Sequence, residues 1–207
     1  MDLKLEKKLW RKGYDTVIGI DEVGRGCLAG PMYLCAAILR KQDERKLRMI
    51  RGVNDSKQLS SKKRAEIFEC VEELNIPYLI FKASPKLIDR HNIYRAALLG
   101  CDALLRKYSS QNEGTFFTVF DGGLRAALFE KEHQGTYIKG DQNIFSIALA
   151  SVIAKHLRDT HMIELTKKFP DYGWERNKGY GTEFHRGAIA QYGTSPLHRL
   201  TFLRNVI

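Results

Sequence analysis

Cysteine is scarce in this sequence, and its spacing speaks against two classes of protein. The four cysteines lie at positions 27, 35, 70 and 101 of 207 residues, and no two of them form a C-x-x-C pair. Such spacing supports neither a disulfide framework nor a cysteine zinc site. The first twelve residues are charged throughout and do not resemble a signal peptide. We therefore expect free thiols in a reducing, cytoplasmic setting.

Long hydrophobic runs are missing as well. The longest uncharged stretches, 27–39 and 144–154, are shorter than the roughly 20 apolar residues that a membrane helix needs. We therefore expect no association with a membrane.

Acidic residues are in the minority. Asp and Glu number 24 against 34 Lys and Arg, which gives a formal net charge of +10. This surplus favours a polyanionic partner over a small neutral metabolite. Many basic proteins bind no nucleic acid, so charge alone does not decide between these possibilities.

The length and the 43% hydrophobic content are those of one folded domain with a substantial core. Strands are predicted at 17–20, 32–39, 76–82, 115–120 and 136–139, and helices at 3–11, 60–74, 92–108, 143–165 and 182–191. Strands interspersed with helices predict an α/β sheet with helices on its faces. We expect residues 1–207 to form a single domain, in which about 167–207 are a C-terminal helical extension.

Acidic residues follow the ends of three predicted strands. Asp21 and Glu22 come after the first strand, Asp121 after the strand at 115–120, and Asp141 after the strand at 136–139. Because ligand sites in open α/β sheets gather beyond strand ends, these side chains can converge. Four carboxylates without a supporting histidine pattern favour a hard ion such as Mg²⁺ or Mn²⁺ over zinc.

Each acid also has an ordinary structural explanation. Asp141 precedes a helix, where Asp is a common N-cap, and Asp121 before two glycines can be a turn residue. The adjacent pair Asp21 and Glu22 is harder to explain in this way, because neighbouring carboxylates repel each other unless a cation or a donor compensates.

A basic protein with a four-carboxylate site suggests phosphoryl-transfer chemistry on nucleic acid. Two divalent ions held by such acids can activate a water and stabilise the leaving oxygen. A protein side chain acting as a base is not required.

The sequence resembles ribonuclease HII, the type 2 ribonuclease H family, over nearly its whole length. The matching motifs occur in the family's order, which makes them more specific together than singly. They are Gly19-Ile20-Asp21-Glu22-Val23-Gly24-Arg25-Gly26 with Leu28-Ala29-Gly30-Pro31, Asn54-Asp55-Ser56-Lys57 with Leu59-Ser60, Ile88-Asp89 with Asn92-Ile93 and Ala96, Asp121-Gly122, Lys139-Gly140-Asp141, Ala150-Ser151 with Ile153-Ala154-Lys155 and Arg158-Asp159, Lys178-Gly179-Tyr180-Gly181-Thr182 with His185, and Ser195-Pro196 with His198-Arg199 and Phe202.

The resemblance implies a ribonuclease H-like fold, with a mixed central sheet flanked by helices. It implies an endoribonuclease that cuts the RNA strand of RNA/DNA hybrids and incises 5′ of a single ribonucleotide in duplex DNA, leaving 3′-hydroxyl and 5′-phosphate ends. The family's metal-site carboxylates fall on Asp21, Glu22, Asp121 and Asp141, the acids that the strand ends select. The metal would be Mg²⁺ or Mn²⁺, with two ions when substrate is bound.

The resemblance also implies how substrate is recognised. Backbone groups of Gly24, Arg25 and Gly26 would sense the ribose 2′-hydroxyl, and Tyr180 would pack on that sugar; without the family, the three residues indicate only a tight turn. Phosphate contacts would come from Lys57, Asn92, Ser151 and Lys155, although an isolated lysine is more often a solvated surface residue. Structural hydrogen bonds are preferred to catalysis for Arg158, Asp159, His185, His198 and Arg199.

Some positions depart from the family's pattern. Cys27 replaces the usual proline, Gly123 extends a glycine pair, and the segment 142–145 with Leu149 is bulkier than the small residues typical there. These departures bear on substrate fit and rate more than on the chemistry.

Two alternatives remain. A ribonuclease HIII-like hybrid nuclease usually has an extra N-terminal domain and lacks the intact Gly-Arg-Gly turn, whereas here the first strand is predicted near residue 17. A nucleic-acid-binding module without catalysis would have little reason to keep four acids near phosphates. We expect a monomer, and the segment 201–207 shows no obvious sliding-clamp-binding pattern.

Overall fold

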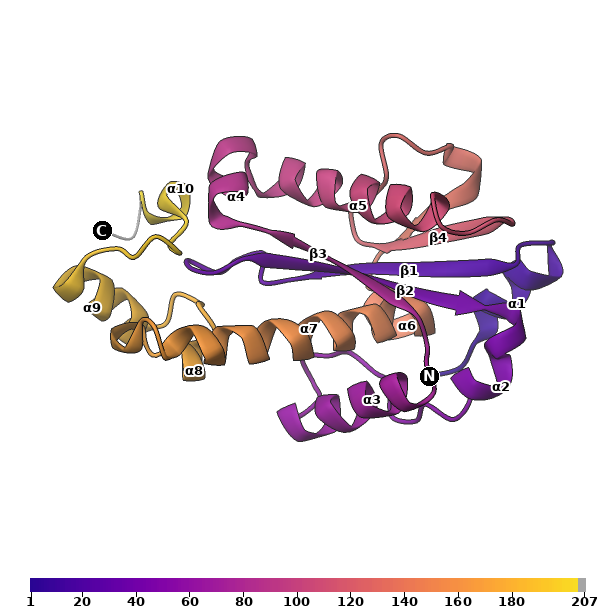
Figure 1. Ribbon diagram of the computed structural model, residues 1–207, viewed down its shortest axis with the longest axis horizontal. Coiled ribbons are helices and arrows are strands. Elements are labelled where there is room, and N and C mark those ends of the chain that lie inside the picture. Colours follow the sequence, from indigo (N-terminus) through magenta and orange to yellow (C-terminus); the bar gives the residue numbers. More distant parts are fainter. Residues whose placement is uncertain (205–207) are drawn as a thin grey trace.

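A five-stranded sheet forms the centre of the molecule in the computed structural model, which describes residues 1–204 (Figure 1). The strand order across the sheet is β3-β2-β1-β4-β5. The strands are β1 (Thr16–Val23), β2 (Met32–Arg40), β3 (Tyr78–Ala83), β4 (Phe116–Asp121) and β5 (Gln134–Tyr137).

The sheet is mixed, as the resemblance predicted. β2 lies antiparallel to β1 and β3, whereas β4 is parallel to β1 and β5 is parallel to β4. β1 and β2 are buried on both faces, which explains their continuous apolar composition. Residues 24–31 connect these two strands and contain the predicted glycine turn.

Helices cover both faces of the sheet (Figure 1). The first strands' odd-numbered side chains pack with α1 (Lys4–Arg11), α3 (Ser61–Glu73) and α7 (Phe145–Thr166), while even-numbered ones such as Ile18 and Ile20 pack with α5 (Ile93–Ser109). Shorter helices complete this part: α2 (Glu44–Leu47), α4 (Pro85–His91) and α6 (Gly140–Asn143), with 3₁₀ turns at Lys41–Asp43 and Lys131–His133.

The start of α7 is fixed against β1 and against the first helix. A side chain on Gly19 would collide with the backbone of Ser146 and Ile147, so glycine permits direct packing two residues before Asp21. Glu6 is fully buried, and its Oε1 accepts hydrogen bonds from the backbone N–H and hydroxyl of Ser146, at 2.9 and 2.7 Å. Glu6 therefore caps α7 from far away in the sequence, because the N-cap residue itself supplies no side-chain bond.

The C-terminal region packs at the far end of α7 and returns to the glycine turn. It contains a 3₁₀ turn at Pro170–Tyr172, then α8 (Trp174–Asn177), α9 (Glu183–Tyr192) and α10 (Leu200–Leu203). An isolated antiparallel bridge joins Ala29 to His198. The tail segment 201–207 lies partly outside the described residues.

Several predicted boundaries were wrong. β5 ends at Tyr137 and not at residue 139, because Lys139 adopts a left-handed conformation with φ of 56°. β3 begins at Tyr78, after Pro77. Asp141 lies inside the short helix α6, and the N-cap of the long helix is Ile144. The N-cap interpretation of Asp141 therefore does not hold.

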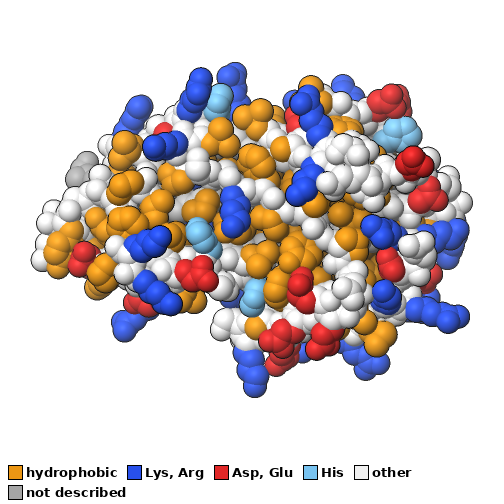
Figure 2. Space-filling view, viewed as in Figure 1, with side chains coloured by type: hydrophobic (Ala, Val, Ile, Leu, Met, Phe, Trp, Pro, Cys, Tyr) orange, Lys and Arg blue, Asp and Glu red, His pale blue; other side chains and the backbone are white. Residues whose placement is uncertain are grey.

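The surface distributes its charge widely. On the face shown in Figure 2, Lys and Arg side chains are spread over the whole molecule with acids between them. The net charge alone therefore does not locate a binding surface. Within the described part of the chain, no helix is both long and apolar enough to cross a membrane.

Candidate active site

The register of the parallel strands brings Asp21 and Asp121 to the same level. Ile20 on β1 pairs with Phe120 on β4, so the next residue on each strand is an aspartate. Asp121 in turn pairs with Tyr137 on β5, four residues before Asp141. The ends of β1 and β4 therefore bring Asp21 and Asp121 to one end of the sheet, as the sequence predicted, whereas Asp141 follows β5 inside α6.

Asp21 is buried, and its Oδ1 accepts the backbone N–H of Glu22 at 2.8 Å. Burial raises the pKa of Asp21 well above its ordinary value, and the charges of Glu22 and Asp121 raise it further, whereas the nearby hydroxyl of Ser151 lowers it. The site therefore opposes the negative charge of this carboxylate unless a cation is close.

Glu22 is held by Arg25 from the glycine turn. The guanidinium of Arg25 lies 2.9 Å from Oε1 of Glu22. Burial raises the pKa of Glu22 despite this ion pair, and the charge of Asp121 adds to the rise. Neighbouring residues on a strand point to opposite faces of the sheet, so Asp21 and Glu22 start in opposite directions. The ion pair with Arg25 holds the side chain of Glu22 toward the glycine turn.

Asp121 is the electrostatic centre of the four acids. Its charge contributes to a raised pKa at Asp21, Glu22 and Asp141. Its Oδ1 accepts the backbone N–H of Gly140 at 2.6 Å, which ties the end of β4 to the segment that carries Asp141. The four predicted acids therefore share one electrostatic environment.

Asp141 has an acidic neighbour that the sequence analysis did not assign to the site. Burial raises the pKa of Asp141, and Asp121 and Asp55 raise it further, whereas Lys57 lowers it. Asp55 is buried and accepts hydrogen bonds from the side-chain amides of Gln142 and Gln58, at 3.2 and 3.3 Å. Its place beside Lys57 in the Asn-Asp-Ser-Lys motif was the available signal.

The carboxylates suit a divalent cation in kind, because all are oxygen donors, and burial with repulsion from neighbouring acids disfavours the charged forms of Asp21, Glu22 and Asp141. In the conformation of residues 1–204, however, no three His, Cys, Asp or Glu side chains are arranged closely enough to hold an ion. The oxygen donors are therefore of the right kind for a metal, but in this conformation Glu22 and Asp121 are bonded to Arg25 and to the N–H of Gly140.

The glycine turn lies against the loop that carries Tyr180. The backbone N–H groups of Leu28 and Ala29 both donate to the carbonyl of Gly179, at 2.8 and 3.2 Å. Tyr180 is 39% exposed, with Nζ of Lys155 5.7 Å and Cζ of Arg158 6.0 Å from its ring centroid. The structure therefore brings together the two predicted parts of a sugar-recognition site.

The two outer glycines of the turn differ. Gly24 has φ of +86°, and a side chain there would collide with the guanidinium of Arg158. Gly26 has no atom within 4 Å of an added Cβ and no positive φ. The fold therefore requires glycine at position 24, whereas nothing inside the protein requires it at position 26.

Cys27 lies buried behind this turn, where the family usually has proline. Its thiol donates to the carbonyl of Lys178 at 3.7 Å and lies beside the hydroxyl of Tyr180. Burial raises the pKa of the thiol, and it raises the pKa of Tyr180 to about 12. Cys27 thus joins the turn to the Tyr180 loop.

The structure also shows where the other residues that depart from the family's pattern lie. Gln142 bonds to Asp55, while the bulky Ile144, Phe145 and Leu149 are buried in the core beneath the sheet. A side chain on Gly123 would meet no atom within 4 Å. The bulky residues therefore pack into the interior and not into the space around the acids.

The four residues predicted to contact phosphate have different surroundings. Lys57 is exposed near Asp141, and Nζ of Lys155 lies 2.8 Å from Asp159 and faces Tyr180. Ser151 is buried, and its hydroxyl bonds to that of Ser56 at 2.8 Å. The exposed Asn92 caps α5 by accepting the backbone N–H of Arg95.

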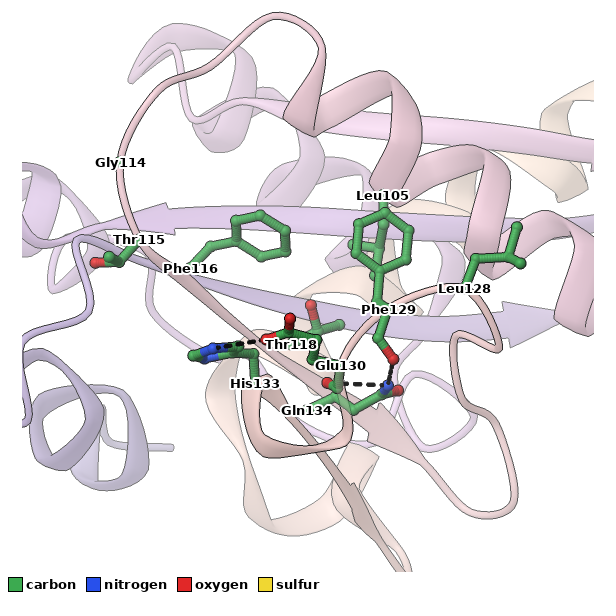
Figure 3. A pocket seen from close by; sticks show the side chains of 10 residues that line it. All are labelled: Leu105, Gly114, Thr115, Phe116, Thr118, Leu128, Phe129, Glu130, His133 and Gln134. Atoms are coloured by element: carbon green, nitrogen blue, oxygen red, sulfur yellow. Dashed lines mark hydrogen bonds and ion pairs between the residues drawn. The ribbon is translucent and has the colours of Figure 1, made fainter.

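A hollow elsewhere on the protein is unrelated to these residues. Figure 3 shows a cavity of about 400 Å³ at the start of β4, the opposite end of that strand from Asp121. Leu105, Phe116 and Phe129 contribute to its lining, and no predicted site residue does. The cavity is therefore separate from the candidate active site.

Comparison with known proteins identifies the family. The family model described as ribonuclease HII matches residues 18–205. This chain belongs to the ribonuclease HII family. Ribonuclease HII of Thermosynechococcus vestitus is 40% identical over 208 residues, which cover 100% of this chain and 92% of that protein. The family comprises metal-dependent hydrolases of phosphodiester bonds that act as endoribonucleases on RNA/DNA hybrids.

Solved structures support the fold. The ribonuclease HII in a complex with PCNA from Archaeoglobus fulgidus is 25% identical, with a TM-score of 0.70, over 89% of this chain and 94% of that one. Bst-RNase HIII in complex with Mn²⁺ has a TM-score of 0.70 at 21% identity, over 91% of this chain and 67% of that one. The latter likeness concerns the fold alone.

Proposed function

We propose that this ribonuclease HII cuts the RNA strand of RNA/DNA hybrids and also incises duplex DNA on the 5′ side of a single ribonucleotide. The products carry 3′-hydroxyl and 5′-phosphate ends. The observation that supports this proposal is the gathering of four carboxylates at one end of the sheet, where the charge of Asp121 raises the pKa of the other three, beside a turn that lies against the loop of Tyr180.

Asp21, Glu22, Asp121 and Asp141 would hold the metal, which we propose is Mg²⁺ or Mn²⁺, with two ions when substrate is bound. Divalent ions at these carboxylates would activate a water and stabilise the leaving oxygen. The raised pKa values of Asp21, Glu22 and Asp141 support this role, because a cation would relieve the repulsion that raises them. Among the structural neighbours, the Bst enzyme was solved with Mn²⁺.

Backbone donors hold two of these acids. The N–H of Glu22 donates to Asp21, and the N–H of Gly140 donates to Asp121. Because no three acids among residues 1–204 are close enough in this conformation to share an ion, the four side chains would have to move together to bind it. The ion pair with Arg25 links Glu22 to the substrate-recognition turn.

The turn Gly24-Arg25-Gly26 and Tyr180 would recognise the ribose. Because the fold does not require glycine at position 26, close approach of a ligand accounts for it best. The 2′-hydroxyl is the group that separates RNA from DNA. The half-exposed ring of Tyr180 offers a flat surface on which the sugar can pack.

Phosphates of the duplex would be contacted by Lys57, Asn92, Ser151 and Lys155. For Lys155, a cavity of about 490 Å³ supports this assignment, because Arg64, Arg176 and Lys178 also line it. These contacts would position the duplex without reading its sequence. In this conformation Ser151 is buried and bonds to Ser56.

We further propose that the whole chain acts as one catalytic domain and as a monomer, because residues from β1 to α10 build the site without a second copy. Its four free cysteines fit a reducing compartment such as the cytoplasm. Light scattering at micromolar concentration tests the oligomeric state, and a stable dimer would contradict the proposal.

The decisive experiment is a cleavage assay with Mg²⁺ or Mn²⁺ on duplex DNA that contains one ribonucleotide. The matched substrates are the same duplex without the ribonucleotide and a long RNA/DNA hybrid. We expect one nick on the 5′ side of the ribonucleotide and none in the all-DNA duplex. Efficient cutting of the hybrid alone would favour an activity like that of ribonuclease HIII, and binding without any cutting would favour a non-catalytic module.

A further inference from the structure

The segment Ser195–Arg199 reaches both parts of the proposed sugar-recognition site. Arg199 is fully buried, and its side chain donates to three backbone carbonyls: Gly24 at 2.8 Å, Arg25 at 2.8 Å, and Gly30 at 2.9 and 3.0 Å. A carboxylate would be the usual partner of a buried guanidinium. Here all of these bonds go to the backbone around the turn.

These bonds determine which backbone groups of the turn face outward. In a planar trans peptide the C=O and the following N–H point in opposite directions, and no cis peptide occurs in the described chain. Because Arg199 draws the carbonyls of Gly24 and Arg25 inward, the N–H groups of Arg25 and Gly26 point away from it. Neither N–H has a partner among residues 1–204. Arg199 therefore presents two neighbouring donors on the outer side of the turn.

The adjacent residue, His198, connects to Tyr180 through a buried relay. The backbone N–H of Ser195 lies 2.9 Å from Nδ1 of His198. Nε2 of His198 lies 3.2 Å from Nε2 of His185, and Nδ1 of His185 lies 2.9 Å from the carbonyl of Tyr180. Both imidazoles are buried.

The backbone N–H of Ser195 at one end of the relay determines which ring nitrogen of each neutral histidine carries the proton. An amide N–H can only donate, so Nδ1 of His198 is an acceptor and the ring carries its proton on Nε2. Nε2 of His185 accepts hydrogen bonds from this N–H of His198 and from the indole N–H of Trp174, at 3.2 and 3.1 Å. His185 therefore carries its own proton on Nδ1 and donates it to the carbonyl of Tyr180.

We propose that His198 and Arg199 are positioning residues that hold the two parts of the sugar-recognition site, the glycine turn and the Tyr180 loop, from the interior of the protein. Arg199 aims the outward N–H groups of the turn, and His198, acting through His185, fixes the backbone of Tyr180. Neither side chain touches the substrate. The inference rests on the proposed function, because it assigns these residues to the recognition of the ribose.

The test uses variants that keep or cut single bonds. His198→Asn places an oxygen where Nδ1 was and keeps the bond to Ser195, but its side chain is too short to reach His185. His198→Gln places an amide N–H near the position of Nε2 and keeps the relay. Arg199→Lys keeps the charge and loses the bonds to several carbonyls at once. The control is Tyr172→Phe, which removes a buried bond to the carbonyl of Gly193 in the same cluster.

The readout is the single-turnover rate at one ribonucleotide in duplex DNA, per folded molecule. We expect a loss of tenfold or more for His198→Asn and for Arg199→Lys, against less than threefold for His198→Gln and for Tyr172→Phe. Mn²⁺ binding, measured by calorimetry without substrate, should stay as in the unchanged protein. In a Tyr180→Ala background, His198→Asn should cause no further loss, because it acts through Tyr180.

A measurement on the unchanged protein avoids any dependence on variants that fold poorly. Long-range ¹⁵N–¹H NMR spectra should show neutral rings at pH 7, with the proton on Nε2 of His198 and on Nδ1 of His185. Opposite tautomers or a charged ring would overturn the relay.

The possible failures are distinguishable. A protein that cuts neither ribonucleotide-containing substrate overturns the proposed function together with this inference. A protein that cuts both, with variants that retain the rate of the Tyr172→Phe control, overturns the inference alone.

Discussion

The carboxylate edge and the C-terminal brace, which comprises Arg158, His185, His198 and Arg199, treat buried polar groups in opposite ways. At the edge, Asp21 is buried and Glu22 is partly buried beside other acids, and their pKa values rise because the surroundings disfavour charge. In the brace, Arg158 donates to the carbonyls of Ala29, Pro31 and Lys178, and the two imidazoles pass matched hydrogen bonds.

The difference shows which of the two regions satisfies its buried polar groups with partners from the protein alone. Buried polar groups with full sets of partners stabilise a unique arrangement, whereas repelling carboxylates destabilise the fold until something compensates. The brace needs nothing from outside the chain. The edge is arranged for a positive charge that the protein supplies only in part, through Arg25 and Lys57.

The largest expected effect comes from removing one charge at the edge. Asp121→Asn should reduce cleavage by roughly a thousandfold or more, while binding of the duplex stays largely intact. Without metal, its thermal midpoint should equal or exceed that of the unchanged protein, because the repulsion with three other acids is weaker. Cleavage assays and thermal denaturation check both parts, and near-normal turnover would remove Asp121 from the metal site.

The exposed side of the recognition site should give a smaller effect. Tyr180→Ala removes a ring on which a sugar can pack, and we expect cleavage at a lone ribonucleotide to fall roughly ten- to a hundredfold. The thermal midpoint should change little, because the ring is partly exposed. A lower midpoint with unchanged activity per folded molecule would show that Tyr180 serves the fold and not the substrate.

The two outer glycines of the turn separate the demands of the fold from those of the substrate. Gly24→Ala should lower the free energy of unfolding by about 1–3 kcal/mol, since the new methyl group meets Arg158 and φ is positive. Gly26→Ala should leave stability within about 0.5 kcal/mol, yet reduce cleavage roughly tenfold, because the methyl group faces the substrate. Denaturant unfolding and cleavage rates measure the pair, and normal cleavage by Gly26→Ala would place the ribose elsewhere.

The smallest expected effect is a pH dependence of the brace. Burial lowers the pKa of His198 from 6.5 to about 4, so the folded protein keeps this ring neutral. As the pH falls, the unfolded chain binds the proton first, and the stability that the neutral ring provides is lost between about pH 6.5 and 4. Between pH 7 and 5 the midpoint of the unchanged protein should fall by roughly 2–4 °C more than that of His198→Gln. Equal shifts would mean that His198 titrates normally in the folded state.

The sequence could predict the edge because short-range patterns encode it. Apolar runs that end on acids marked β1 and β4, and their parallel register then placed Asp21 beside Asp121. The end of β5 was predicted two residues too late, since nothing local announces the left-handed Lys139. Asp55 could not be assigned to the site because it follows no predicted strand, and only the fold brings it beside Asp141.

The sequence analysis assigned structural hydrogen bonds to the four residues of the brace, and the structure shows such bonds. Their partners could not be predicted in the same way, because the bonds of Arg158 and Arg199 join residues that are far apart in sequence. Only the folded chain shows three carbonyls converging on Arg199. Glu6 is a similar case. It lies in the helix predicted at 3–11, yet this acidic side chain is buried and caps α7, because the distant end of that helix lacks a side-chain cap of its own.

The bonds from Arg199 to Gly24 span 175 positions of the chain. During synthesis the residues that carry all four carboxylates leave the ribosome well before those that hold the turn. A nascent or prematurely terminated chain that stops before Ser195 would therefore contain the acids without the parts that set the sugar-recognition turn. Emergence of residues 195–199 would then be the step at which the proposed recognition of ribose becomes possible.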